Sequence, residues 1–432
     1  MIRIDDLVES MSRVRVHKVK GRLLHAVGPL LEAELPGAIV GGLVTVGQGC
    51  LCEVVGFRER RTLLMPLDTT SGIGFGTEVL WKDEAISVAV GEELLGRVLD
   101  GFGRPIDGGP PLSNRVRRPV FASAPDPLGR KLISEPMPTG VRVLDGLLTI
   151  GKGQRISIMA GSGVGKSTLL GMIARYAKAH VNVVCLVGER GREVREFLEH
   201  NLGGAGLART VMVVVTGEKS AALQVKGAFL ATTIAEWFRD QGMDVLMLMD
   251  SLTRLAQAQR QIGLAAGEPP TRGGYTPSVF ALLPQLLERA GPGDNGGSIT
   301  GIYTVLVDGD DIHDPVGDAV RGIVDGHVVL SRKLASHGQY PAVDVLASLS
   351  RLMNRVADPR HLKAAQRFRD LLATWRENEE LIRLGAYRKG TSAAVDEAVE
   401  RYPSLRAFLC QGVEEPVEYG QLISQLCQAV GV

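Results

Sequence analysis

The chain has 432 residues, enough for two or three domains, and 45% hydrophobic against 22% charged residues is the balance of a globular protein. Its 49 basic and 48 acidic side chains leave a net charge of +1, which gives no broad attraction to nucleic acid or to a membrane surface. The sequence begins without the features of a signal peptide, and no stretch nears the ~20 apolar residues of a membrane span. We therefore expect a cytoplasmic protein.

Cysteine usage points the same way. The five cysteines are odd in number, scattered, and without paired metal-ligand spacing: Cys50, Cys52, Cys185, Cys410 and Cys427. The sequence therefore predicts reduced thiols with a structural role.

The amino-terminal part divides into a short segment and a β-rich region. Residues 1–17 carry apolar side chains at helical spacing between Ile4 and Met11, which fits either a docking helix or a frayed terminus. In residues 18–92, short β-branched runs are broken by Gly and Pro. Such short, regularly spaced strands predict a small barrel or sandwich.

The central region, residues 93–357, alternates strand-like and helical patterns after Pro/Gly-rich linking segments at 101–111 and 136–140. This alternation predicts a parallel sheet with helices on both faces. The expected strands are 155–160, 182–187, 211–216, 245–249 and 299–307. Residues 358–432 lose the strand signal and repeat apolar positions at helical spacing, which predicts a C-terminal helical domain.

The stretch from Ile156 to Leu170 is typical of strand, glycine loop and helix. Its glycines let consecutive backbone N–H groups turn around an anion, and the helix directs its positive dipole end at the same point. Lys166 would reach the β- and γ-phosphates, and the Ser167 hydroxyl would take one position on Mg²⁺. Ala160 replaces the first glycine of the G-x-x-x-x-G-K-[ST] pattern, and we expect this small residue to be tolerated. The predicted nucleotide-binding residues of the loop are Gly161, Ser162, Gly163, Val164, Gly165, Lys166, Ser167 and Thr168. A plain glycine-rich turn is the alternative.

Two carboxylates follow predicted strands, at the edge of the sheet where ligands collect. Asp250 ends a fully apolar run and is expected to hold Mg²⁺ through its water shell, although a lone acid there could instead cap the next helix. Glu189 lies just beyond another strand and can orient and polarise an attacking water. The charges that follow it are interpreted as a solvated helix face: Arg192, Glu193, Arg195 and Glu196.

Further short motifs accompany the phosphate loop: Pro138–Gly140, Gly151–Arg155, Gly188–Arg190, Asp250–Arg254, Tyr340–Asp344 and Ser350–Arg351. Together they resemble the rotary-type hexameric ATPases, over nearly the whole chain. Two longer runs, Gly188–Phe197 and Asp325–Arg332, resemble the type III protein-export ATPases of flagella and injectisomes in particular.

The resemblance implies a RecA-like α/β core between an N-terminal β-barrel and the C-terminal helices, with ATP and Mg²⁺ bound. It implies that Glu189 is the general base, that Arg190 and Arg254 approach the phosphates, and that Tyr340 stacks on adenine. It also implies that Arg351 is an arginine finger supplied to the neighbouring subunit's site.

One chain that carries both the base and the finger predicts a homo-oligomer, and the resemblance implies a six-membered ring. The resemblance further implies a stator-like regulator at the N-terminal segment, a central stalk protein in the pore, and export-gate membrane proteins, export substrates and chaperones as partners. It places the protein at the inner face of the cell membrane when docked. The loop Gly267–Pro277 resembles a pore-lining loop, with an ordinary surface loop as the alternative.

The expected function is ATP hydrolysis that energises type III export through release and unfolding of substrates and chaperones. Tyr275–Phe280 and Gly385–Gly390 favour the flagellar version, with an injectisome ATPase as the alternative. The chain lacks the Asp-Glu-Leu-Ser-Glu-Glu-Asp run of synthase catalytic subunits, and Glu189 argues against a non-catalytic ring subunit. An RNA-driven translocase would need a basic, aromatic-rich barrel, so the 5% aromatic content and near-zero net charge favour no nucleic-acid partner.

Overall fold

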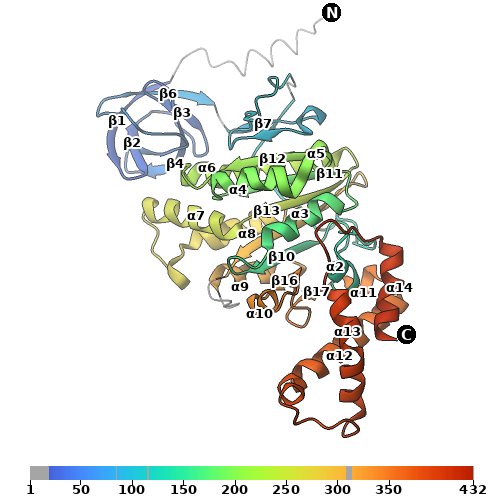
Figure 1. Cartoon of the computed structure of the whole chain (residues 1–432). Coiled ribbons are helices and arrows are strands. Elements are labelled where there is room, and N and C mark those ends of the chain that lie inside the picture. Colours follow the sequence, from blue (N-terminus) through green and yellow to red (C-terminus); the bar gives the residue numbers. More distant parts are fainter. Residues whose placement is uncertain (1–18, 84, 114–115, 308–313, 432) are drawn as a thin grey trace, which may run out of the picture.

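Three parts follow one another along the molecule in the computed structural model, which describes residues 19–83, 85–113, 116–307 and 314–431. A β-barrel lies at one end, an α/β domain in the middle, and a group of helices at the other end (Figure 1). The segment 1–17, for which a docking helix and a frayed terminus are the alternatives, falls outside the described residues. The exact domain boundaries stay predictions.

The N-terminal part is a closed antiparallel barrel, as predicted, with strand order β1-β2-β5-β4-β3-β6. Alternate side chains such as Leu31, Val44 and Leu64 fill its interior, and closure leaves no strand edge unpaired. Its strands are β1 (Lys20–Val27), β2 (Leu30–Glu34), β3 (Leu43–Val46), β4 (Cys50–Arg58), β5 (Arg61–Pro66) and β6 (Glu78–Asp83).

The barrel is joined to the middle domain by the connecting chain and by partly buried polar contacts. The linker contains the small β7 (Ser87–Ala89) and β9 (Arg117–Pro119) pair and the turn η1 (Glu92–Leu94). Lys226 of the middle domain forms an ion pair with Glu53 of β4, and its ammonium lies 4.0 Å from the centre of the Phe121 ring. The Ser220 hydroxyl donates to the carbonyl of Leu67 at 3.0 Å.

The middle domain is built on a nine-stranded sheet with order β17-β16-β10-β15-β13-β11-β12-β8, in which β14 also pairs with β15. Only β14 and β17 run antiparallel to their neighbours. All five predicted strands are present, each within one residue of its predicted ends. The strands are β8 (Val98–Leu99), β10 (Arg155–Ala160), β11 (Val181–Val187), β12 (Thr210–Val215), β13 (Asp244–Asp250), β14 (Gly291–Pro292), β15 (Ser298–Leu306), β16 (Gly326–Leu330) and β17 (Leu349–Ser350).

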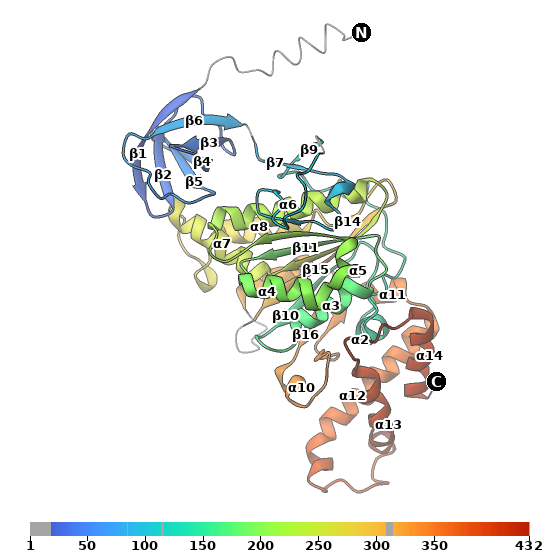
Figure 2. The ribbon, with the colours of Figure 1, turned by 45° about the horizontal axis from the view of Figure 1, so that its top comes forward.

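Helices cover both faces of this sheet, as predicted (Figure 2). Along β11, Val183 and Cys185 pack with one layer of helices, whereas Val184 and Leu186 pack with the other, so the strand is buried on both sides. The first layer is α6 (Ala221–Asp240), α7 (Leu252–Ala266), α8 (Pro277–Leu287) and α9 (Pro315–Ile323). The other face carries α2 (Arg142–Leu147), α3 (Lys166–Tyr176), α4 (Gly191–Glu196), the π-helix η2 (Phe197–Leu202) and α5 (Gly203–Ala208).

The C-terminal part is helical, as predicted. The carboxylate of Asp358 caps its first helix by accepting from the backbone N–H of His361. The buried His361 ring donates from Nε2 to the carbonyl of Gly146 at 2.7 Å, which attaches this part to α2. The remaining elements are η3 (Arg272–Gly274), α10 (Arg332–Ser336), α11 (Met353–Val356), α12 (Pro359–Arg383), α13 (Ala393–Leu409) and α14 (Tyr419–Val430).

Two sequence-based expectations about the whole chain can be compared with the structure. The five cysteines all lie among the described residues and are free thiols. A search of the described helices finds none with the length and apolar character needed to cross a membrane.

Candidate active site

The phosphate loop lies between β10 and α3, at the carboxyl edge of the sheet. Gly163 and Gly165 have φ of +78° and +89°, conformations that residues with a Cβ rarely adopt. Ala160 is instead the last residue of β10, paired with Leu306 and Leu330 in ordinary extended conformation, which explains why alanine is tolerated there. The loop therefore has glycine where the backbone requires it.

Lys166 and Asp250 meet at the end of this loop. Lys166 is the first residue of α3, Asp250 is the last residue of β13, and the lysine ammonium donates to the Asp250 carboxylate. The hydroxyl of Thr304, in the neighbouring β15, donates to the same carboxylate oxygen at 2.6 Å. Asp250 is 6% exposed, so its charge is stabilised by these two donors rather than by bulk water.

Glu189 lies two residues beyond the end of β11 and is buried beside this pair. The pKa of its carboxyl is raised to about 7, mainly by burial and secondly by the negative charge of Asp250. The nearby Lys166 ammonium acts in the opposite direction. Its Oε1 atom has no hydrogen-bond partner within the described part of the chain. A buried acid with a free acceptor and a pKa near neutrality is suited to taking a proton from water.

A cavity of about 570 Å³ brings most of the predicted site together. Its walls come from the phosphate loop, from Glu189 and Arg190 beyond β11, and from Arg254 on α7. Val164 is buried beneath the loop, and Asp250 lies next to the cavity through its bond to Lys166. The predicted residues that line the cavity are Gly161, Ser162, Gly163, Gly165, Lys166, Ser167, Thr168, Glu189, Arg190 and Arg254.

The two predicted arginines at this cavity differ in how they are held. The Arg190 side chain is 81% exposed and makes a 3.7 Å ion pair with Glu193. Arg254 donates to the Gln257 side chain at 3.3 Å, and its buried Nε has no partner among the residues described. Arg254 also packs closely over Gly188, where a Cβ would lie 2.7 Å from the Arg254 Cβ. The site therefore contains a guanidinium, that of Arg254, for which the described residues supply no ion pair.

Tyr340 lies beside the phosphate loop. A Cβ placed on Gly165 would lie 3.6 Å and 3.7 Å from two ring carbons of Tyr340, so the ring borders the loop directly. The side chain is half exposed, which leaves ring surface available for stacking. Its contact with a nucleotide base stays a prediction.

Arg351 lies away from the cavity, at the opposite edge of the sheet. It follows β17, and its backbone N–H donates to the carbonyl of Asp325 at 3.0 Å, next to the point where β10 begins at Arg155. The length of β10 separates this point from the phosphate loop, roughly 17 Å at about 3.3 Å per residue. Arg351 is exposed, and it does not line the cavity beside the phosphate loop.

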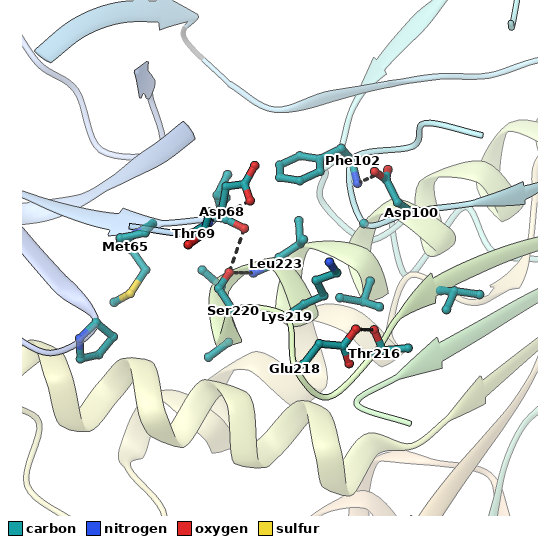
Figure 3. A pocket seen from close by; sticks show the side chains of 18 of the residues that line it. Met65, Asp68, Thr69, Asp100, Phe102, Thr216, Glu218, Lys219, Ser220 and Leu223 are labelled. Carbon is teal, nitrogen blue, oxygen red and sulfur yellow. Dashed lines mark hydrogen bonds between the residues drawn. The ribbon is translucent and has the colours of Figure 1, made fainter. Parts of the chain in front are cut away.

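A larger cavity of about 840 Å³ lies between the barrel and the middle domain and contains none of the predicted site residues. Figure 3 shows Asp68 and Thr69 on the barrel side facing Lys219 and Ser220, which precede α6, with Phe102 on a third side. Its lining loop touches the active site, because the N–H of Gly217 donates to the carbonyl of Glu189 at 3.1 Å. The barrel is thus linked to the backbone of Glu189 through this loop.

Sequence reasoning missed several residues that shape the site. Thr304 bonds to Asp250 from the middle of a strand, and Asp325 binds both Arg155 and the backbone of Arg351. Gln411, in the C-terminal part, donates from its backbone to the carbonyl of Tyr340. No motif marks Thr304 or Gln411, and the run Asp325–Arg332 marks Asp325 without indicating its partners, because each contact joins segments that are far apart in sequence.

Comparison with known proteins agrees with this arrangement. Residues 140–350 match the ATP synthase alpha/beta family, nucleotide-binding domain, and residues 357–428 match the T3SS EscN ATPase C-terminal domain. The flagellum-specific ATP synthase of Bacillus subtilis is 49% identical, covering 100% of this chain and 99% of its own length. The type 3 secretion system ATPase of Xanthomonas euvesicatoria is 48% identical, covering 97% of this chain and 96% of its own.

The chain belongs to the family of type III export ATPases. It is an ATP-hydrolysing enzyme of the ATP synthase alpha/beta type. The structure of the assembled ATPase EscN from enteropathogenic E. coli has a TM-score of 0.92 and 45% identity, covering 95% of this chain and 100% of EscN. EscN in complex with its central stalk EscO has a TM-score of 0.89. The predicted family and fold are both confirmed.

Proposed function

We propose that this ATPase energises type III protein export by hydrolysing ATP in the cavity beside the phosphate loop. The observation that carries the proposal is the convergence of three elements at one sheet edge: Lys166 from α3, Asp250 from β13 and Glu189 from the end of β11. Lys166 binds phosphate, and Glu189 accepts a proton from the attacking water. In this proposal Arg190 and Arg254 neutralise phosphate charge, and Tyr340 supports the adenine.

The residues at this edge also suit Mg²⁺. Asp250 offers a carboxylate and Ser167 a hydroxyl next to the phosphate loop, and hard oxygen ligands of this kind are what Mg²⁺ binds along with phosphate oxygens. When bound, Mg²⁺ would neutralise charge on the β- and γ-phosphates. Lys166 and Asp250 neutralise each other in the protein alone, so nucleotide binding would separate them, with Lys166 turning to phosphate.

The position of Arg351 supports a shared site. This exposed arginine is about a strand's length from its own phosphate loop, so it reaches a nucleotide only in another copy of the chain. We propose a ring, with six subunits, in which each copy supplies Arg351 to its neighbour through one repeated interface. A finger arginine of this kind typically raises turnover ~10³–10⁵-fold.

The remaining partners follow from relatives. EscN is known both assembled and in complex with a central stalk, and we propose that this chain also forms a ring around a stalk protein. The loop Gly267–Pro277 is proposed to face the pore. A regulator at the N-terminal segment, and docking of export-gate proteins, substrates and chaperones at the membrane, belong to the same proposal.

Mixing two inactive variants tests the shared site. Glu189→Gln lacks the base and Arg351→Ala lacks the finger, so each alone should be nearly inactive. In mixed rings some interfaces combine an intact base with an intact finger, and we expect part of the ATPase activity to return. Wild-type specific activity should also rise steeply with protein concentration, as the ring forms.

The mixing result separates two outcomes. Recovery of activity supports a site built from two subunits. Linear dependence on concentration, with no recovery on mixing, would show that Arg351 does not act in trans.

We further propose the flagellar system as the setting of this ATPase. Tyr275–Phe280 and Gly385–Gly390 favour it, whereas the flagellar and type 3 secretion relatives are almost equally similar, at 49% and 48% identity. Expression of this chain should restore swimming in a flagellated bacterium from which the flagellar ATPase has been deleted. Restoration of injectisome secretion without swimming would favour the alternative.

A further inference from the structure

Gln411 lies where three segments of the chain meet. It follows α13 by two residues and is 6% exposed. Its backbone N–H donates to the carbonyl of Tyr340 at 2.9 Å. Its side chain contacts the segment that precedes the phosphate-loop strand, near residues 140–142. One C-terminal residue therefore connects Tyr340 with the segment at residues 140–142.

The side-chain amide of Gln411 is almost fully used. Its Oε1 accepts from the backbone N–H of Arg142 at 2.6 Å, and its Nε2 donates to the carbonyls of Gly140 at 2.9 Å and Glu415 at 2.5 Å. Both amide hydrogens and one acceptor position are engaged, which fixes the orientation of the group. Only an uncharged amide satisfies this arrangement, because the two carbonyls require donors and the N–H requires an acceptor.

The segment that receives these bonds is itself rigid. The fully buried carboxylate of Asp145 accepts from the N–H groups of Thr139 and Gly140 at 2.8 Å and 2.9 Å. The N–H of Arg142 is the first of α2, where Val141 makes no side-chain cap within the described chain. Gln411 supplies that missing acceptor from another domain. The side chain of Gln411 is thus anchored to the segment before α2. A displacement of Gln411 would therefore also move its backbone N–H, which is bonded to Tyr340.

We infer that Gln411 is a positioning residue that holds Tyr340 at the distance from the phosphate loop at which the base of ATP binds. The main-chain bond from Gln411 sets the Tyr340 backbone, and the Tyr340 ring borders Gly165 of the loop. The C-terminal helices thereby become part of the nucleotide site, although Gln411 itself touches no phosphate-loop residue in the contacts described here. This inference rests on the proposed role of Tyr340 in base binding.

Gln411→Glu is the sharpest test. It keeps the size of the side chain and the oxygen that accepts from Arg142, but it places a carboxylate oxygen, in place of the NH₂ group, against the carbonyls of Gly140 and Glu415. We expect KM for ATP and the Kd for mant-ATP to rise about tenfold, with kcat within about twofold, as for the loss of one buried hydrogen-bonded group. Gln411→Met, which keeps the volume without charge, carries the test if Gln411→Glu does not fold. Melting curves of the full chain establish folding for each variant.

Arg369→Met is the matched control. Arg369 also reaches from α12 to backbone carbonyls of the middle domain, those of Val345 and Leu147, but it makes no contact with Tyr340. A merely structural loosening of the C-terminal helices should affect this variant similarly. We expect its KM and Kd to stay within about twofold of the wild type.

A double-mutant cycle with Tyr340→Ala decides the inference. If Gln411 acts through Tyr340, the double variant should bind mant-ATP no more weakly than Tyr340→Ala alone, and this outcome supports the inference. Two results would overturn the inference and leave the proposed base site intact. One is additive losses of mant-ATP affinity in the double variant. The other is unchanged mant-ATP binding in Gln411→Glu while Tyr340→Ala binds more weakly. Unchanged binding in Tyr340→Ala would instead refute the proposed base site, and the inference with it.

Discussion

Glu189→Gln should stabilise the nucleotide-free protein at the same time as it removes activity. The buried carboxyl of Glu189 has its pKa raised from an ordinary 4.5 to about 7, mainly by burial and by the charge of Asp250. Ionising it in the folded state is therefore costlier than in the unfolded chain. Glutamine has nearly the same shape and no charge to bury, so the variant avoids this cost.

The size of the effect depends on pH in a defined direction. Below about pH 4.5 the carboxyl is protonated in both states, and no penalty arises. Between 4.5 and about 7 the folded state holds the proton more tightly, so the stability of the wild type falls as pH rises. Above 7 the loss is complete, and a change in pKa from 4.5 to about 7 at 1.36 kcal/mol per pH unit amounts to about 3 kcal/mol.

Calorimetry of the wild type and Glu189→Gln from pH 5 to pH 8, without nucleotide, measures this difference. We expect the melting temperatures to be close at pH 5 and to differ by about 5 to 10 °C at pH 8, with the variant higher. The relevant transition is the one that added ATP shifts upward in the wild type. Glu199→Gln is the control, because Glu199 is an exposed carboxylate in a surface ion pair with Arg195 and should change little. A difference that is constant across this pH range, or that favours the wild type, would refute the reasoning.

Three further predictions concern the same domain. The kcat/KM for ATP should fall about tenfold per pH unit below 7 and level off above it, because only ionised Glu189 accepts a proton; a flat profile between pH 6 and 8 would contradict this. Lys226→Met should lower stability to urea by about 3 kcal/mol, since it leaves the Glu53 side chain, which is only 14% exposed, without its partner. Lys226→Met/Glu53→Met should recover most of the loss, and equal losses in the single and double variants would count against the pair. Gly188→Ala should reduce kcat strongly with folding retained, because a Cβ at φ +71° would lie 2.7 Å from the Arg254 Cβ, and wild-type kcat would show that this packing is dispensable.

The strongest parts of the sequence-based interpretation were local. The strand at 245–249 is a continuous apolar run, and the strand at 155–160 is apolar apart from Arg155 and Ser157. Residues that end such buried strands lie at one edge of a parallel sheet. Lys166, Asp250 and Glu189 could therefore be placed together before any coordinates were known. The two-residue strands β8, β14 and β17 escaped prediction because pairing with a neighbour, and not composition, makes them strands.

The phosphate loop, the succession of barrel, α/β core and helices, and the residue types of the predicted site could be inferred from the sequence alone. All of these depend on short patterns and on hydrophobic periodicity. How the charges of the site are balanced became visible only in the folded arrangement. The raised pKa of Glu189, the bond from Thr304 to Asp250 and the contact of Gln411 with Tyr340 each join segments distant in sequence. The same holds for Arg351, whose exposure at the far edge of the sheet depends on strand order. Burial and distance arise from packing, and no local pattern encodes them.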